Sequence, residues 1–160
     1  MNEQVLNRNA KTLEAEMLWL EEVIKTRMQL RFGNEAAYSS VKKVPMPLLN
    51  NDDSILARVI RHLDYGFDER IVLALSLAPH VKPGALDRFY LKNKIYDRYY
   101  TEFGGLKGRY HSGFLPTGET AAFLIAGNDI AERIRVIEIF KPEHTFYKNN
   151  ILKINLNRGN

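Results

Sequence analysis

The chain has 160 residues and a mass of 18.5 kDa, about the size of one domain, and it is long enough to bury a sizeable core. Hydrophobic residues at 45% and charged residues at 26% exclude the disordered and fibrous classes. The net charge of +4 is unevenly placed, with ten Lys and Arg against eleven Asp and Glu in residues 1–80 and thirteen against eight in residues 81–160. An anionic partner would meet the second half, although an ordinary solvated surface explains the same numbers.

The sequence carries no pattern for export or membrane insertion. Met1 is followed by polar residues rather than by a basic region and an apolar run, and no stretch of about 18 apolar residues occurs. Cysteine is absent, which excludes disulfide frameworks, thiolate nucleophiles and cysteine-ligated metal centres. These features favour a cytoplasmic protein with no membrane partner.

The N-terminal region, 1–33, is expected to form one long amphipathic helix that packs on the body. Residues 3–32 contain no proline or glycine. Apolar residues recur there at helical spacing: Leu6, Leu13, Met17, Leu20, Ile24 and Met28. Gly33 follows as a residue suited to a left-handed C-terminal cap. The apolar stripe also suits a partner helix or a second copy of the chain, and the sequence leaves these alternatives open.

A linker is expected at 34–51, where small and polar residues accompany Pro45 and Pro47. The remainder, 52–160, is expected to form one compact unit with the N-terminal helix. Capping residues and stop signals predict its helices. The first begins after Asp52, Asp53 and Ser54 and runs through about His62, the second covers 69–77 between its cap Asp68 and Pro79, which ends it, and the third runs from Pro83 through about Leu91. The fourth covers 118–126 between Thr117 and Gly127, and the fifth runs from Asp129 through Phe140. Four side chains of the last helix are expected to face inward: Ile130, Ile134, Val136 and Ile137.

Two other segments favour loop and strand. Glycines and aromatic residues concentrate between positions 92 and 116, which predicts loop or irregular strand. Residues 145–147 and 151–156 are β-prone and flank two asparagines, which predicts a terminal β-hairpin. The expected fold is therefore mainly α with a small β-hairpin: a winged-helix-like domain at 52–160, preceded by the long N-terminal amphipathic helix.

No residue pattern predicts catalysis, and no metal or cofactor site is expected in this chain. Gly113 to Thr120 has the glycine spacing of a phosphate-binding loop, but Glu119 stands where the essential lysine would meet the phosphates. The four histidines share no metal-ligand spacing, and Ser112 lacks a nucleophile elbow. We predict a protein that is not an enzyme.

Basic and aromatic residues alternate after position 82. We expect the partner-binding surface at Lys92, Lys94, Arg98, Tyr99, Tyr100, Lys107 and Arg109. Cations suit phosphates and flat rings suit unstacked bases, so nucleic acid is one interpretation. Tyrosine and arginine also dominate protein interfaces, and tyrosines are common at the edges of a core. The residues leave these interpretations open.

Five strings in the chain carry a resemblance to a known protein family. They are Asp68 to Arg70, Leu73 to Pro79, Thr101 to Gly105, Gly113 to Phe123, and Ala126 to Asp129. The chain resembles, from about Leu6 to Leu152, the N-terminal winged-helix-like domain of bacterial AAA-type ATPases. The resemblance is to those of Bacteroidetes that are encoded beside phage-tail-like contractile injection systems.

The resemblance implies a non-catalytic adaptor that docks an ATPase on a protein partner. ATP and Mg would belong to a downstream ATPase module, whose Walker motifs these 160 residues lack. That module would also form a ring and so make the parent protein a homo-oligomer. The alternative is that the same winged helix serves as a DNA-binding module.

Overall fold

The computed structural model describes residues 1–107 and 112–154. It is mainly helical, with 60% helix and 5% strand, and the strands form small antiparallel hairpins. The predicted class, mainly α with a small β-hairpin, is confirmed. The positions of the hairpins differ from the prediction, as described below.

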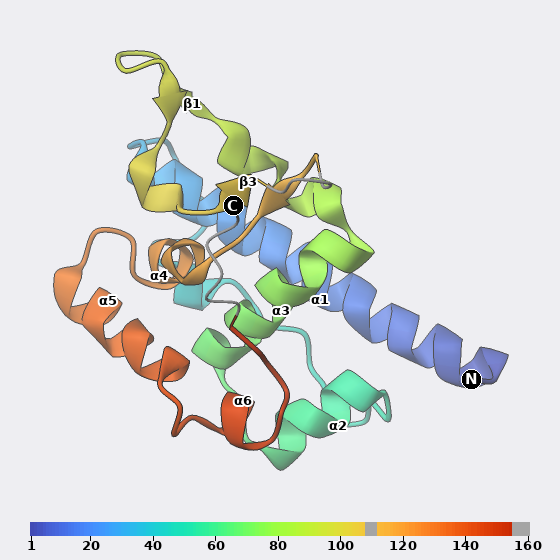
Figure 1. The fold of residues 1–160 in the computed structure, drawn as a ribbon. Coiled ribbons are helices and arrows are strands. Elements are labelled where there is room, and N and C mark those ends of the chain that lie inside the picture. The colour runs from blue at the N-terminus through green and yellow to red at the C-terminus, as the bar shows by residue number, and fades with distance from the viewer. Residues whose placement is uncertain (108–111, 155–160) are drawn as a thin grey trace.

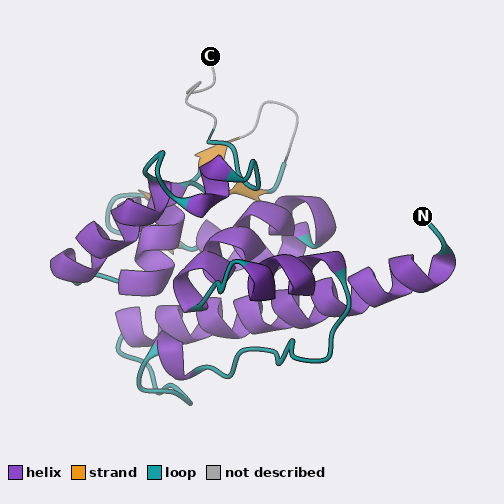
Figure 2. Ribbon diagram, turned by 90° about the horizontal axis from the view of Figure 1, so that it is seen from below, coloured by secondary structure: helices purple, strands orange, loops and turns teal. Residues whose placement is uncertain are grey.

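The longest element is α1, Glu3–Arg31, which confirms the predicted N-terminal helix. Its N-cap Asn2 accepts a hydrogen bond from the Val5 amide at 2.9 Å, and Gly33 follows its end with φ of 70°. Side chains buried against the body begin only at Thr12. The first turns therefore extend beyond the rest of the molecule, as Figures 1 and 2 show.

The segment expected as a linker, 34–51, lies against the body. It contains a 3-10 turn, η1, Val41–Lys43, and the side chains of Val41, Val44 and Leu49 are buried. Pro45 and Pro47 keep the chain extended between these anchors, because proline fixes φ and restricts the residue before it. This path places 47–53 alongside α1, where the two form a groove.

The next two helices follow the predicted order with one correction in α3. Ser54 caps α2, Ile55–His62, through the Ala57 amide at 3.1 Å, as expected. However, α3 spans Phe67–Val81, so Asp68 lies in its first turn rather than at its cap, and Pro79 lies inside its last turn rather than ending it. Pro79 removes one helical hydrogen bond, but the turn persists because Ala78 is fully buried there and its carbonyl accepts the Lys82 amide at 2.9 Å.

After α3 the chain forms short elements. The segment expected as a helix from Pro83 is a 3-10 helix, η2, Pro83–Tyr90. Strand β1, Lys92–Asn93, pairs with β2, Arg98–Tyr99; after the turn η3, Thr101–Phe103, strand β3, Leu106–Lys107, pairs with β4, Phe114–Leu115. Both pairs fall within the region predicted as loop or irregular strand.

Helix α4, Gly118–Ala126, has the predicted bounds and the predicted flanking residues Thr117 and Gly127. It is followed by α5, Ile130–Ile137, and η4, Glu138–Phe140, which together match the predicted helix from Asp129. The inward orientation is correct only for Val136. The other three side chains are 56–74% exposed: Ile130, Ile134 and Ile137. α5 buries a narrow face, so most of its apolar residues remain in water.

The predicted terminal hairpin is wrong over 145–147. These residues form α6, Thr145–Lys148, capped by His144, whose Nδ1 accepts the Phe146 amide at 3.1 Å. Phe146 is fully buried, and its carbonyl accepts the amides of Ile151 and Leu152 at 2.8 and 3.1 Å. Tertiary burial of one aromatic side chain thus overrides the β-propensity of the string. Residues 155–156 of that prediction lie outside the described part.

The core lies where α1, α3 and α4 meet, and two arginines satisfy polar groups within it. Arg70 on α3 forms a nearly buried ion pair with Glu16 on α1, and its Nη2 donates to the Pro47 carbonyl at 3.0 Å. Arg27 on α1 donates from Nε and Nη2 to the carbonyls of Leu124 and Ile125, both at 3.0 Å. These carbonyls belong to the last turn of α4, where a cation also complements the helix dipole.

We predict that Gly127→Ala destabilises the protein more than Gly33→Ala. Both glycines have positive φ, 58° and 70°, so an alanine costs about 1–2 kcal/mol at either position. At position 33 an added Cβ meets nothing within 4 Å, whereas at position 127 it lies 2.8 Å from Arg27 Nη1. Arg27 must then move and weaken its two bonds to α4. Urea unfolding should show a free-energy loss for Gly127→Ala at least about twice that of Gly33→Ala, and equal losses would contradict this role of Arg27.

We also predict that Arg70→Met lowers the free energy of unfolding by about 3–5 kcal/mol, because it leaves the Glu16 carboxylate buried without its partner. The matched control is Lys82→Met, which breaks the half-exposed pair, 3.2 Å apart, between Glu21 on α1 and Lys82, the residue that follows α3. That variant should lose no more than about 1 kcal/mol. Replacing Glu16 and Arg70 together by Met should recover much of the loss. Urea denaturation measures all three, and a small loss for Arg70→Met alone would refute the prediction.

Candidate functional site

The β1–β2 hairpin projects from one corner of the molecule, at the upper left of Figure 1. Lys92 faces Tyr99 and Asn93 faces Arg98 across the strands. The turn between them is fixed locally: Asn93 Oδ1 accepts the Ile95 amide at 3.0 Å, and Asp97 adopts φ of 49°. Asn and Asp suit these turn positions because their short side chains can hydrogen-bond to the backbone and because both residues tolerate the left-handed conformation.

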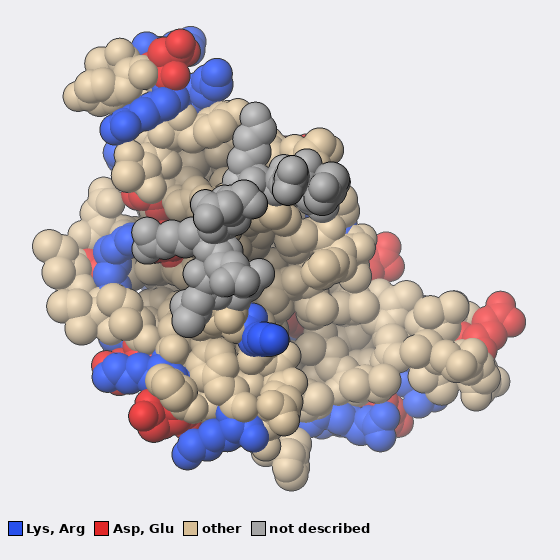
Figure 3. All heavy atoms as spheres, in the orientation of Figure 1, with Lys and Arg blue, Asp and Glu red and all other residues tan. Residues whose placement is uncertain are grey.

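Apolar side chains stand at the end of this turn. Ile95 is 85% exposed and Tyr96 is 69% exposed. Cations of the same hairpin lie over its rings: Arg98 Cζ is 5.8 Å from the ring centre of Tyr96, and Lys92 Nζ is 5.6 Å from that of Tyr99. Figure 3 shows basic side chains around this corner with an acidic group beside them. The hairpin therefore presents an apolar tip with a mainly basic border.

The structure separates the residues expected to form the partner-binding surface. It brings together Lys92, Lys94, Arg98 and Tyr99 on the hairpin. Tyr100 instead packs inward, with its ring centre 4.9 Å from that of Phe32 and 5.2 Å from that of Phe103.

The other two expected residues are elsewhere. Lys107 is in β3 of the second hairpin, opposite Phe114, and its side chain lies outside the described part, as does Arg109 entirely. Sequence reasoning missed Ile95 as a contact residue. The signal that identifies it is the spacing of Asn93 and Asp97, two turn-forming residues around an apolar pair.

The string with phosphate-loop spacing has a structural role in the described residues. It forms β4 and the start of α4, where Thr117 and Thr120 bond the chain around η3. Thr117 Oγ1 accepts the Gly105 amide at 3.1 Å, and Thr120 Oγ1 donates to the Phe103 carbonyl at 2.7 Å. Capping and loop closure account for both threonines.

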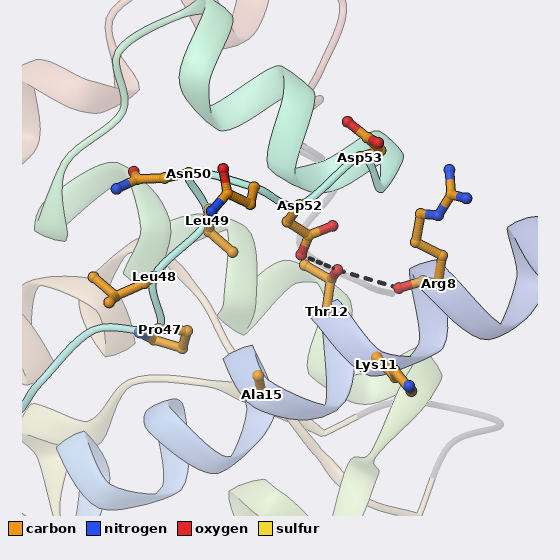
Figure 4. A pocket seen from close by; sticks show the side chains of 11 residues that line it. Arg8, Lys11, Thr12, Ala15, Pro47, Leu48, Leu49, Asn50, Asp52 and Asp53 are labelled. Carbon is orange, nitrogen blue, oxygen red and sulfur yellow. Dashed lines mark hydrogen bonds between the residues drawn. The ribbon is translucent and has the colours of Figure 1, made fainter.

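A second candidate site is a groove of about 530 Å³ between α1 and 47–53, shown in Figure 4. Its lining residues are Arg8, Lys11, Thr12, Ala15 and the run from Pro47 to Asp53. Sequence reasoning assigned Asp52 and Asp53 only to helix capping and gave Arg8 and Lys11 no role. The groove depends on two segments about forty positions apart, so no local pattern could reveal it.

Hydrogen bonds hold the outer wall of this groove in place. Thr12 Oγ1 donates to Asp52 Oδ2 at 2.5 Å, and the Ser54 amide donates to Asp52 Oδ1 at 2.8 Å. Arg61 on α2 donates to the carbonyls of Leu49 and Asp52. Partial burial of the Asp52 carboxyl acts to raise its pKa, but the bonds from Thr12 and Ser54 and the charge of Arg61 outweigh this and lower the pKa. Asp52 is therefore ionised at neutral pH.

Among the described residues no group of three or more His, Asp or Glu side chains is placed to hold a metal ion. Within that same part of the chain, no helix combines the length and apolar character that crossing a membrane requires. Comparison with protein-family models, curated proteins and solved structures gave no match.

We predict that Asp52→Asn lowers the free energy of unfolding at pH 7 by about 1 kcal/mol, because it weakens the bonds to Thr12 and Ser54. The folded-state pKa of Asp52 lies below its ordinary value of 3.8, so the ionised group stabilises the fold above pH 3.8. The advantage of the wild type over Asp52→Asn should disappear as the pH falls from 3.8 through the lowered pKa.

The matched control for this experiment is Asp53→Asn, because Asp53 is exposed and has no hydrogen bond to the described residues. Its stability should follow that of the wild type at every pH. Urea unfolding between pH 2.5 and 7 gives the comparison. A constant difference between wild type and Asp52→Asn across that range would contradict the assignment of the lowered pKa.

Proposed function

We propose that this chain is a non-catalytic adaptor that binds a protein partner through the tip of the β1–β2 hairpin. One observation carries the proposal: Ile95 and Tyr96 stand on a projecting turn with 85% and 69% of their surfaces exposed. Large apolar and aromatic side chains in such places are characteristic interface anchors, because their burial supplies most of the binding free energy.

The turn is suited to act as a rigid anchor. The bond from the Ile95 amide to Asn93 and the left-handed Asp97 fix its shape before any partner arrives. The ring contact of Arg98 with Tyr96 further orders the tip. A preformed tip loses little conformational entropy on binding, so more of the contact energy contributes to affinity.

Charge around the tip indicates the chemistry of the partner surface. Lys92, Lys94 and Arg98 carry three positive charges against the single carboxylate of Asp97. A complementary surface has an apolar pocket for the tip and acidic residues around its rim. Such charges direct encounter and orientation more than they add affinity.

A DNA-binding module is the second candidate, favoured by the same three cations. The rings argue for protein instead. Proteins that bind single strands stack bases on open aromatic faces, but Arg98 and Lys92 already occupy one face of Tyr96 and Tyr99. Ile95, the most exposed member of the tip, has no aromatic face to offer a base.

The wider setting of this function rests on the sequence resemblance alone. It supports a cytoplasmic adaptor domain of an AAA-type ATPase within a contractile injection system. ATP and Mg would be bound, and a homo-oligomeric ring formed, by a downstream ATPase module. A Walker lysine in coding sequence that follows Asn160 would support this setting, and its absence from the full gene would contradict it.

The hairpin is tested with the double variant Ile95→Asp, Tyr96→Ser and the matched control Ile134→Asp, which changes an equally apolar exposed residue on α5. The 160-residue chain is immobilised, retained proteins from a cytosolic extract are identified, and the affinity of each purified candidate is measured by calorimetry. We expect the double variant to lose at least about tenfold in affinity and the control to keep it. A partner that binds all three proteins equally would contradict the proposal.

A salt titration with duplex and single-stranded DNA tests the second candidate. Three phosphate contacts from the hairpin would give a slope of log affinity against log salt of about −3 on duplex DNA. We expect no saturable binding at 0.15 M salt with either form. Saturable binding with that slope, lost on reversing the charges of Lys92 and Arg98, would favour the DNA-binding module instead.

A further inference from the structure

A different surface carries an inference that does not depend on the hairpin. We propose that the groove between α1 and 47–53 binds a short apolar peptide with a free amino end and a free carboxyl end, such as a dipeptide or tripeptide. The groove has a volume of about 530 Å³. That falls within the roughly 300–1,000 Å³ typical of small-molecule sites and gives room for more than one residue.

The charges lining the groove balance. Arg8 and Lys11 supply two cations from α1, and Asp52 and Asp53 supply two carboxylates from the opposite wall. Among the described residues, Arg8, Lys11 and Asp53 have no side-chain hydrogen bond or ion pair. Such a groove offers an anion, for example a nucleotide, as much repulsion as attraction. It complements a ligand that carries one charge of each sign.

The apolar and the charged residues that line the groove lie toward its opposite ends. Figure 4 shows Pro47, Leu48 and Leu49 along one side, while Arg8 and Asp53 stand at the other end with Asp52 and Thr12 between them. Leu48 is 89% exposed, so an aliphatic side chain of a ligand could bury it. A short aliphatic peptide matches this arrangement if its two charged groups contact Asp52 and Arg8 and its side chains extend toward Pro47 and Leu48.

The carboxylate of Asp52 is prepared to receive an ammonium group. Its two oxygens each accept one internal bond, from Ser54 and from Thr12, and each retains an unused lone pair. Those bonds and the nearby Arg61 keep it ionised, as described above. Arg8 supplies a planar guanidinium that suits a carboxylate, which it can bind through two parallel hydrogen bonds.

The wall that presents these groups is held in place without a ligand. Arg70 from α3 bonds the Pro47 carbonyl, and Arg61 from α2 bonds the carbonyls of Leu49 and Asp52. Thr12 joins Asp52 to α1 across the groove. Binding therefore requires no ordering of 47–52, which favours recognition of a small ligand.

The experiment titrates the full chain, labelled with ¹⁵N, with four probes and follows amide chemical shifts. The probes are Leu-Leu, N-acetyl-Leu-Leu, Leu-Leu-amide and free leucine. We expect Leu-Leu to shift amides along the groove saturably and to bind about fivefold to tenfold more tightly than either blocked form, because each blocked form loses one charge contact. Leucine should bind more weakly because it reaches fewer of the apolar groups.

Variants assign each end of the ligand. Arg8→Gln should abolish the preference for Leu-Leu over Leu-Leu-amide, and Asp52→Asn should abolish the preference over N-acetyl-Leu-Leu. The matched controls are Lys25→Gln and Glu22→Gln, exposed residues of α1 outside the groove, which should preserve both preferences. These readouts compare ligands on one folded protein, so a change in stability does not imitate them.

Several outcomes would overturn the proposal. These are the absence of saturable shifts with Leu-Leu, equal binding of the blocked and free peptides, and retention of the corresponding preference by Arg8→Gln or by Asp52→Asn. Leucine binding as tightly as Leu-Leu would contradict a peptide as the ligand. The variant Ile95→Asp, Tyr96→Ser should bind Leu-Leu like the wild type, so failure of the hairpin proposal and failure of this one are separate results.

Discussion

The arrangement of the molecule depends on the buried ion pair between Arg70 and Glu16. Burial raises the pKa of Glu16, against the opposing effect of the Arg70 guanidinium. The same guanidinium lies 5.5 Å from the ring centre of Trp19 and bonds the Pro47 carbonyl. One side chain therefore joins α3 to α1 and also to the extended segment. Because a buried charge without its partner is costly, the pair restricts how these three parts can be placed relative to one another.

The two candidate sites differ in how far they depend on that ion pair. The groove is a direct product of it, since Arg70 and Arg61 hold the segment that forms one wall against α1, which forms the other. The β1–β2 hairpin is remote and mostly local in origin, since Asn93 and Asp97 determine its turn. A rigid projecting tip suits a macromolecular surface, whereas a fixed groove with balanced charges suits a small dipolar ligand.

Features that depend on interactions between nearby residues were predicted correctly from the sequence, whereas features that depend on distant neighbours were not. The bounds of α4 follow from Thr117 and Gly127, which act on adjacent backbone, and the end of α1 follows from Gly33. Predictions that needed knowledge of neighbours were wrong for α6 and for the isoleucines of α5. Phe146 becomes helical because a pocket in the core receives its ring. Ile130, Ile134 and Ile137 remain in water because α4 packs against the opposite side of α5.

The helical class, the long N-terminal helix and most capping positions could be predicted from the amino-acid order, because these features depend on residues within a few positions of one another. That order also singled out the basic and aromatic region that contains the hairpin. Three features became visible only in the folded molecule: Tyr100 packs inward, Ile95 stands at the tip, and Arg8 faces a segment some forty positions away. The physical reason is that burial and charge pairing depend on which elements become neighbours, and local patterns carry no information about that choice.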